Sequence, residues 1–137
     1  MKREIVRDII FLQRHAEAAT PDDAAVAVDL KDTLEAHLET CAGLAANMIG
    51  STKAIIAFRH DKKTIIMYNP EIVKTSKNTY ETEEGCLSLT GTRPCTRFET
   101  IEVQYEDVHF KKKRKKFTGF TAEVIQHEVD HLHGILI

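Results

Sequence analysis

Two histidines, His127 and His131, stand four residues apart near the end of the chain, and Glu128 directly follows the first. On a helix they lie only about 40° apart, so both imidazoles can turn a nitrogen toward one ion. The glutamate then lies beside that ion without binding it, which is a typical layout for a base next to a metal. A chance match and two ordinary core histidines are the competing interpretations, and the shared face favours metal binding.

A catalytic metal usually takes three protein ligands and keeps one position for water, so a third ligand is needed. In metal proteases with this helix motif the third ligand lies further along the chain. Here only His133, on the wrong side of the helix, and a few apolar residues follow, which disfavours a protease. Upstream, Cys86 offers a thiolate after a strand-like stretch. Alone it would more often be a buried structural thiol, and only the histidine pair makes it the candidate third ligand.

The histidines are expected on a helix over residues 121–133, ended by Gly134, because glycine best adopts the left-handed conformation past a helix end. Ile125, Val129 and Leu132 fall on one side of this helix, which predicts that this side packs. The two histidines fall on the opposite side, which is left to hold a ligand.

The segments that must position this helix change along the chain from a helical to a strand-like pattern of apolar residues. Apolar residues recur at three- and four-residue steps from Asp22 to about Cys41, which predicts an amphipathic helix that Pro21 helps to start. The later segments favour strands. The expected strands are TKAIIAFRH (52–60) paired with KKTIIMYNP (62–70) in a hairpin ended by Asn69-Pro70, then EIVKTS (71–76), and RFETIEVQYED (97–107).

The predicted fold class is therefore α+β, with small antiparallel β-sheets around a C-terminal metal-binding helix and an N-terminal amphipathic helix. A length of 137 residues predicts a single domain over 1–137. With 42% hydrophobic residues and no long apolar run, the chain is expected to be soluble and cytoplasmic, with no membrane partner. Three irregularly spaced cysteines make a disulfide framework unlikely.

The basic run KKKRKK (111–116) holds six of the 19 lysines and arginines. One interpretation is contact with ribosomal RNA or another polyanion. The other is an edge strand of a hairpin, kept soluble by its lysines. The second is favoured, because no aromatic residues interleave the basic ones as a base-stacking surface would need. A DNA partner is not expected.

Three blocks of this sequence resemble the peptide deformylases, which remove the formyl group from the N-terminal formylmethionine of new bacterial polypeptides. EGCLS (84–88) and QHEVDHL (126–132) match the family blocks without exception, and CAGLAANM (41–48) partly matches the block Gly-x-Gly-Leu-Ala-Ala-x-Gln. The order of the blocks is also that of the family. The resemblance implies the deformylase fold and a hydrolase that processes N-formylmethionyl peptides during protein biosynthesis. The protein is expected to be a monomer, and a contact with the ribosome is possible.

The resemblance also implies the roles of the site residues. One divalent metal ion, Fe(II) in the cell with Zn(II), Ni(II) or Co(II) able to replace it, would be bound by Cys86, His127 and His131. Glu128 would be the acid and base, and the Leu87 backbone N–H would donate to the oxyanion. Substrate-binding roles would fall to Gly43, Ala42 and Val124.

The first block departs from the family at three positions. Met48 stands in place of the glutamine that donates to the oxyanion, and a thioether has no hydrogen to donate. Loss of one such donor typically costs about 10²- to 10³-fold in rate, so weak activity is expected. Cys41 replaces a glycine and is expected to narrow the approach to the site, while Ala42 replaces a larger aliphatic residue.

Three hypotheses about function remain open from the sequence. The first is a metal-dependent deformylase with Glu128 as acid and base. The second is a catalytically impaired relative that binds metal and peptide or the ribosome without efficient turnover. The third is a metal hydrolase of altered substrate, because Cys41 and Ala42 reshape the mouth of the pocket.

Overall fold

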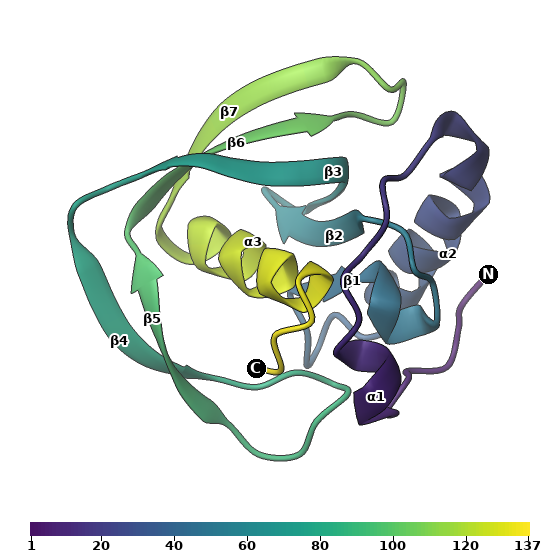
Figure 1. Cartoon of the computed structure of the whole chain (residues 1–137), viewed down its shortest axis with the longest axis horizontal. Coiled ribbons are helices and arrows are strands. Elements are labelled where there is room, and N and C mark those ends of the chain that lie inside the picture. Colours follow the sequence, from purple (N-terminus) through teal and green to yellow (C-terminus); the bar gives the residue numbers. More distant parts are fainter.

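A computed structural model describes all residues, 1–137. Helix α3 runs through the middle of the molecule, between a five-stranded sheet and a two-stranded hairpin (Figure 1). The other helices are α1 (Ile9–Leu12) and α2 (Ala24–Glu35), α3 spans Gly119–Leu132, and short 3₁₀ helices lie at Pro21–Asp23 and Ala46–Ile49. The strands are β1 (Gly43–Ala45), β2 (Ile55–His60), β3 (Lys63–Thr75), β4 (Thr79–Glu84), β5 (Arg93–Phe98), β6 (Thr100–Glu106) and β7 (Lys112–Thr118). None of the helices has the length and apolar character needed to cross a membrane.

The larger sheet has the strand order β1-β2-β3-β6-β7, with antiparallel neighbours throughout, and β4 pairs with β5 separately. The predicted hairpin of 52–60 and 62–70 is confirmed as β2 and β3. Strand β7 lies at the edge of the sheet and carries most of the basic run 111–116, nearly all of it exposed. The run therefore forms an edge strand, as the favoured interpretation predicts, and that its lysines keep the edge soluble stays a prediction.

The expectation that the hairpin ends at Asn69-Pro70 and that 71–76 forms another strand is wrong, because β3 continues to Thr75. The strand passes these residues through an irregularity in its pairing with β6, between Tyr68 and Glu71. Asn69 takes a φ of 51°, which asparagine tolerates better than most residues. Its side chain also bonds both backbone groups of Ala19, at 2.7 and 3.0 Å, which holds the N-terminal segment against the strand.

The segment 97–107 was predicted as one strand, but it divides at Glu99 between the two sheets. Phe98 pairs with Thr79 in the hairpin, whereas Thr100 pairs with Thr118 in the larger sheet. An alternating pattern cannot reveal such a change, because both strands keep one face toward the interior.

Helix α2 is shorter than the predicted span 22–41, because the chain leaves the helix after Glu35 to reach β1. The apolar pattern continues beyond that point, yet Leu38 is 41% exposed. The predicted start is close, since Thr20 forms a capping box with Asp23 and Pro21 opens the first turn.

Helix α3 begins at Gly119, two residues before the prediction, and ends at Leu132, one residue before the predicted end. Gly134 has a φ of 76°, and a Cβ there would lie 2.2 Å from the carbonyl oxygen of Gln13. Only glycine fits both requirements. This ending packs the chain segment after α1 against the end of α3.

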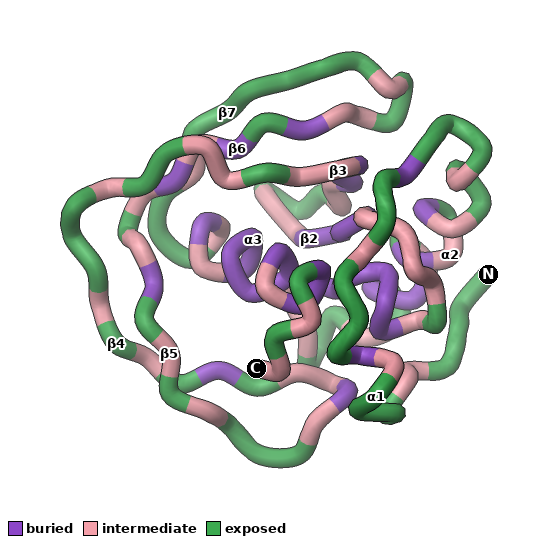
Figure 2. The backbone as a smooth tube through the Cα atoms, in the orientation of Figure 1, coloured by how far each residue is buried: buried purple, intermediate pink, exposed green.

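Two hydrophobic clusters form the core, one mainly under α2 and one mainly between the larger sheet and α3. Buried residues concentrate on α3 and β2, while β7 is exposed along most of its length (Figure 2). The expectation of one packing side and one open side for α3 is incomplete, because its histidine side is also buried: His127 is 6% exposed and His131 5%. These two candidate ligand side chains are therefore held inside the molecule.

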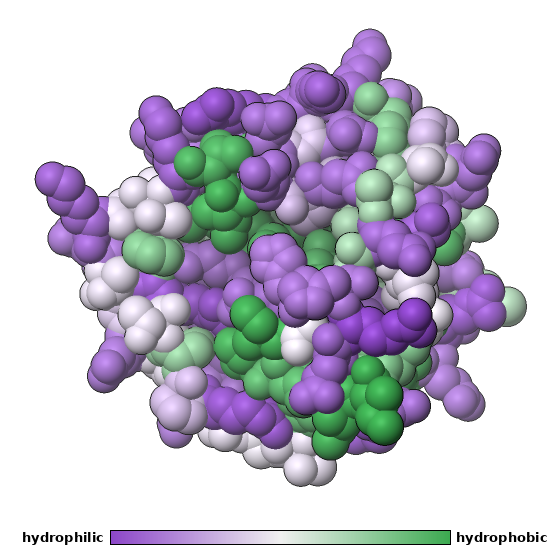
Figure 3. All heavy atoms as spheres, viewed as in Figure 1, coloured by the Kyte–Doolittle hydropathy of each residue, from purple (hydrophilic) through white to green (hydrophobic).

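Most of the face seen in Figure 3 is hydrophilic, and apolar side chains gather over α1 at its lower right. Ile9 and Ile10 on α1 are 51% and 80% exposed. Short helix α1, which was not predicted, is capped by Asp8, whose carboxylate accepts from the Ile10 backbone N–H.

Candidate metal centre

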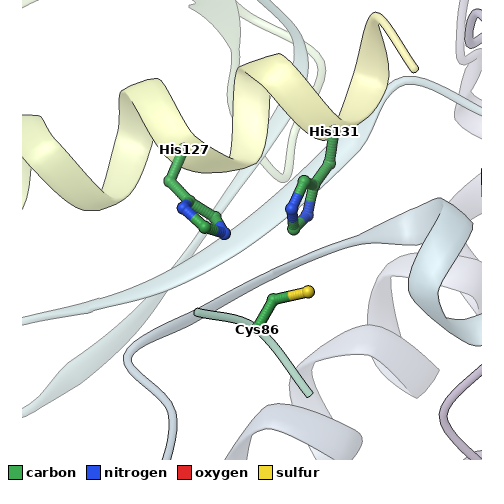
Figure 4. Close-up of side chains that lie close together, drawn as sticks. All are labelled: Cys86, His127 and His131. Carbon is green, nitrogen blue, oxygen red and sulfur yellow. The ribbon is translucent and has the colours of Figure 1, made fainter. Parts of the chain in front are cut away.

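The structure brings Cys86, His127 and His131 together, with one possible ligand atom from each lying within 4.8 Å of the others. The two histidines point from α3 toward the cysteine, which lies on the segment after β4 (Figure 4). A tetrahedral ion with bonds of about 2.0–2.3 Å holds its ligand atoms about 3–4 Å apart. Only a small movement of the three side chains is therefore needed for them to bind one ion. One thiolate and two imidazoles suit Zn(II), Fe(II), Co(II) or Ni(II).

The second ring nitrogen of His127 is occupied by a carboxylate. Nδ1 donates to Oε1 of Glu84 at 2.6 Å, which leaves Nε2 as the nitrogen free to bind a metal. Arg97 donates to the same carboxylate and also to Asp130, with its shortest contact to each at 2.6 Å. The side chains of Arg97 and Glu84 are 5% and 7% exposed, so a buried chain of charges supports this ligand.

The pKa values of the three candidate ligands reflect their mutual contact in the absence of an ion. Burial alone would raise the pKa of the Cys86 thiol, but hydrogen bonds from both histidines outweigh it and lower the pKa to about 6. Burial lowers the pKa values of the histidines, yet bonding to Cys86 and to nearby carboxylates raises them to about 9 for His127 and about 10 for His131. The cysteine is thus prepared as a thiolate, the form that binds metals.

Glu128 is buried next to His131, with its Oε1 3.2 Å from Nδ1 of the histidine. That distance makes an ion pair, but its geometry falls short of a hydrogen bond, so neither atom has a hydrogen-bond partner. Because a buried carboxylate oxygen without a hydrogen bond is costly, this one is suited to accept a hydrogen bond from a ligand in the cleft. Residue Ile137 also approaches, with its carbonyl oxygen 3.2 Å from Nε2 of His131.

The site opens into a cleft of about 250 Å³ beside α3. The predicted substrate-binding residues Gly43, Ala42 and Val124 all line it, as does Leu87. Gly43 is required by close packing: a Cβ there would lie 2.6 Å from Cγ1 of Val124 and 3.1 Å from Oε2 of Glu128. The backbone of the first block therefore lies directly against the candidate base.

The two altered residues of the first block lie in different places. Cys41 lines the cleft, as expected from its replacement of a glycine, and its thiol donates to the Gly43 carbonyl at 2.8 Å. Burial raises the pKa of Cys41 to about 12, so it stays a neutral thiol. Met48 is 1% exposed and lines a second cavity of about 10 Å³, on which Cys86 and His131 also border.

Sequence reasoning missed four residues that support the site. Glu84 and Arg97 were not singled out, although Glu84 stands only two residues before Cys86. The Gln126 side chain accepts from the Phe98 N–H and donates to its carbonyl, both at 2.9 Å, which fixes β5 against α3. Asn47 donates to the His131 carbonyl at 2.8 Å. Glu84, Gln126 and Asn47 could have been found from the sequence, because each is a polar residue inside one of the three blocks that match the family. All three cysteines, Cys41, Cys86 and Cys95, are free.

Comparisons with known proteins agree with this geometry. The family model described as polypeptide deformylase matches residues 6–137. A peptide deformylase of Clostridium beijerinckii is 54% identical over 137 residues, which is the full length of both chains. One from Synechocystis is 40% identical over 100 residues, but the match spans only 54% of that relative.

Solved structures show the same likeness. A class I type b peptide deformylase from Acinetobacter baumannii with Met-Ala-Ser bound has a TM-score of 0.90 at 26% identity, with 99% of this chain and 97% of that one covered. The peptide deformylase from Thermotoga maritima gives 0.88 at 27% identity, with 99% and 94% covered. The predicted fold class is confirmed by these structures.

Proposed function

The chain belongs to the peptide deformylase family, and we propose that its cleft hydrolyses the formamide of N-formylmethionyl peptides with the aid of one divalent metal ion. Cys86, His127 and His131 are the proposed ligands. The observation that supports this most strongly is their convergence within 4.8 Å, beside the buried carboxylate of Glu128, whose Oε1 makes no hydrogen bond. A bound ion supplies Lewis acidity, which makes hydroxide available from water near neutral pH. Fe(II) is the proposed ion in the cell.

Each protein group has a task in the proposed reaction. Glu128 accepts the proton of the attacking water and returns it to the departing amine. The backbone N–H of Leu87 donates to the oxyanion that forms on the formyl group. Gly43 leaves room for the Glu128 side chain, and Ala42 and Val124 provide apolar wall for the first residue of the peptide.

Release of formate from N-formyl-Met-Ala-Ser by anaerobically prepared, metal-loaded protein tests this function. We expect metal-dependent release that falls at least about 10²-fold in Glu128→Ala, because a positioned acid and base contributes about that much or more. Equal release by the parent and by Glu128→Ala would contradict the proposal.

A second candidate function is a relative that binds metal and peptide but turns over slowly. Met48 favours it, because this residue is buried and has no hydrogen to donate to an oxyanion. Slow formate release together with tight peptide binding by the parent would support this candidate. A contact with the ribosome is a further possibility that a sedimentation assay with ribosomes would test.

A further inference from the structure

A small cavity borders the candidate metal centre on a side away from the substrate cleft. It measures about 10 Å³, and Cys86 and His131 both line it. Only Cys86 lines the cavity and the cleft alike. Figure 4 shows the side chain of Cys86 directed beneath the ring of His131. One water molecule needs about 10–15 Å³, so this cavity has room for a single water.

Two buried polar atoms in the lining of this cavity have no hydrogen-bond partner in the protein. They are Oδ1 of Asn47, which is 6% exposed, and Oγ of Ser88, which is 4% exposed. Buried polar atoms are nearly always bonded to protein or to internal water, because leaving them unbonded costs free energy. A wholly apolar cavity can stay dry, but two such atoms make this one a site for water.

The orientation of the Asn47 amide is fixed by its other contacts. Nδ2 donates to the carbonyl oxygen of His131 at 2.8 Å and to that of Leu12 at 3.4 Å. Because both partners are acceptors, the amino group must face them and Oδ1 must be the atom left over. Oδ1 can only accept, whereas the hydroxyl of Ser88 can donate. A water that donates to Oδ1 and accepts from Ser88 keeps one hydrogen for a further acceptor.

Two acceptors on the metal ligands could take that hydrogen. Nδ1 of His131 already lies in an ion pair with Glu128, at 3.2 Å from Oε1. The sulfur of Cys86 is the other, and a thiolate that binds a metal still has lone pairs to accept a hydrogen bond. Hydrogen bonds to such a sulfur draw electron density from it and so tune the metal.

We infer that Asn47 and Ser88 hold an ordered water in this cavity, and that this water donates its remaining hydrogen to the sulfur of Cys86. The inference rests on the proposed function, because it takes Cys86 as a metal ligand. Asn47 and Ser88 are then positioning residues: they contact neither the metal nor the peptide, and they act on the centre through the water.

A crystal structure of the zinc-loaded protein, at a resolution that shows ordered water, tests the site directly. We expect one water within about 3.0 Å of Oδ1 of Asn47 and of Oγ of Ser88, and close enough to donate to the sulfur of Cys86. A cavity without ordered water, or a water bonded to His131 in place of Cys86, would overturn the inference.

The absorption spectrum of the cobalt-loaded protein reports on the same sulfur in solution. Ser88→Ala removes one partner of the water, so the hydrogen bond to the sulfur should weaken and the sulfur-to-cobalt charge-transfer band should move to longer wavelength. Thr90→Ala is the matched control, because it removes an exposed hydroxyl outside the cleft and the cavity, and it should leave the band in place. An unmoved band in a folded Ser88→Ala protein would contradict the role of Ser88.

Neither measurement requires turnover, so the inference and the proposed hydrolysis can fail separately. A parent that releases formate but holds no water in the cavity would overturn the inference alone. A parent with the water bonded to Cys86 but without formate release would support the inference and remove only the proposed hydrolysis.

Discussion

Nδ1 of His127 donates a 2.6 Å hydrogen bond to Oε1 of Glu84, and this contact determines which nitrogen of the ring can bind a metal. The same carboxylate is held by Arg97, which reaches on to Asp130 at the far end of α3. One candidate ligand is therefore oriented by residues of β4, β5 and α3 together, before any ion binds.

Replacing Glu84 should weaken metal binding. Glu84→Ala frees the His127 ring to rotate and leaves Arg97 with one carboxylate fewer, so we expect a loss of about ten- to a hundredfold in metal affinity. Competition with a chelator measures the affinity. Glu81→Ala, on the exposed side of the same strand, is the control and should bind metal like the parent.

Stability of the metal-free protein should fall in acid because of the same carboxylate. Burial opposes ionisation of Glu84, but hydrogen bonds from His127 and Arg97 outweigh it and hold its pKa well below the usual value. A lowered folded-state pKa contributes stability above the unfolded value of about 4.5, and that contribution is lost as the pH falls toward the folded pKa. Urea unfolding between pH 7 and pH 3 should show a shallower decline in Glu84→Gln than in the parent. Identical slopes would assign the decline to other carboxylates.

A glutamine at residue 48 should supply the proposed oxyanion donor that Met48 lacks. Met48→Gln is expected to raise kcat for N-formyl-Met-Ala-Ser by about 10²-fold with little change in KM, because the donor acts mainly in the transition state. The small cavity that Met48 lines also borders Asn47 and Ser88, whose Oδ1 and Oγ have no partners and can receive the buried amide. Met48→Leu, of similar volume and without a donor, should leave kcat unchanged. A similar gain from leucine would show that packing, not hydrogen bonding, limits the rate.

Adding a methyl group at Gly43 should disturb the proposed base, Glu128, but not the proposed metal ligands. In Gly43→Ala the new Cβ would lie 2.6 Å from Cγ1 of Val124 and 3.1 Å from Oε2 of Glu128, so α3 or the Glu128 side chain must shift. We expect lower kcat, retained metal, and a loss of about 1–3 kcal/mol in the free energy of unfolding. Adding Val124→Ala removes the closest contact and should recover part of the stability. If it recovers none, the contact with Val124 is not the cause.

Much of the candidate site was predictable because its residues lie in short blocks of the sequence. The spacing of His127 and His131 fixes their shared face whatever surrounds the helix, and EGCLS supplies a cysteine at a strand end. The support for these residues was harder to predict. Arg97 contacts Glu84 from a strand thirteen residues later, and no local pattern records such a distant pairing.

The fold was predicted correctly where local sequence signals determine it. It was predicted wrongly where contacts between distant parts of the chain determine it. The hairpin of β2 and β3 and the glycine that ends α3 follow from local preferences. The passage of β3 through Asn69, however, depends on bonds to Ala19, which lies fifty residues earlier. The division of 97–107 at Glu99 likewise reflects a change of sheet that burial periodicity cannot record.

X-ray absorption by the zinc-loaded protein tests the proposed centre most directly, since it reports the atoms bonded to the metal. The three-ligand site predicts one sulfur at about 2.3 Å and two imidazole nitrogens at about 2.0–2.1 Å, with the sulfur lost in Cys86→Ser. A first shell without sulfur in the parent, or one that is unchanged in Cys86→Ser, would contradict it.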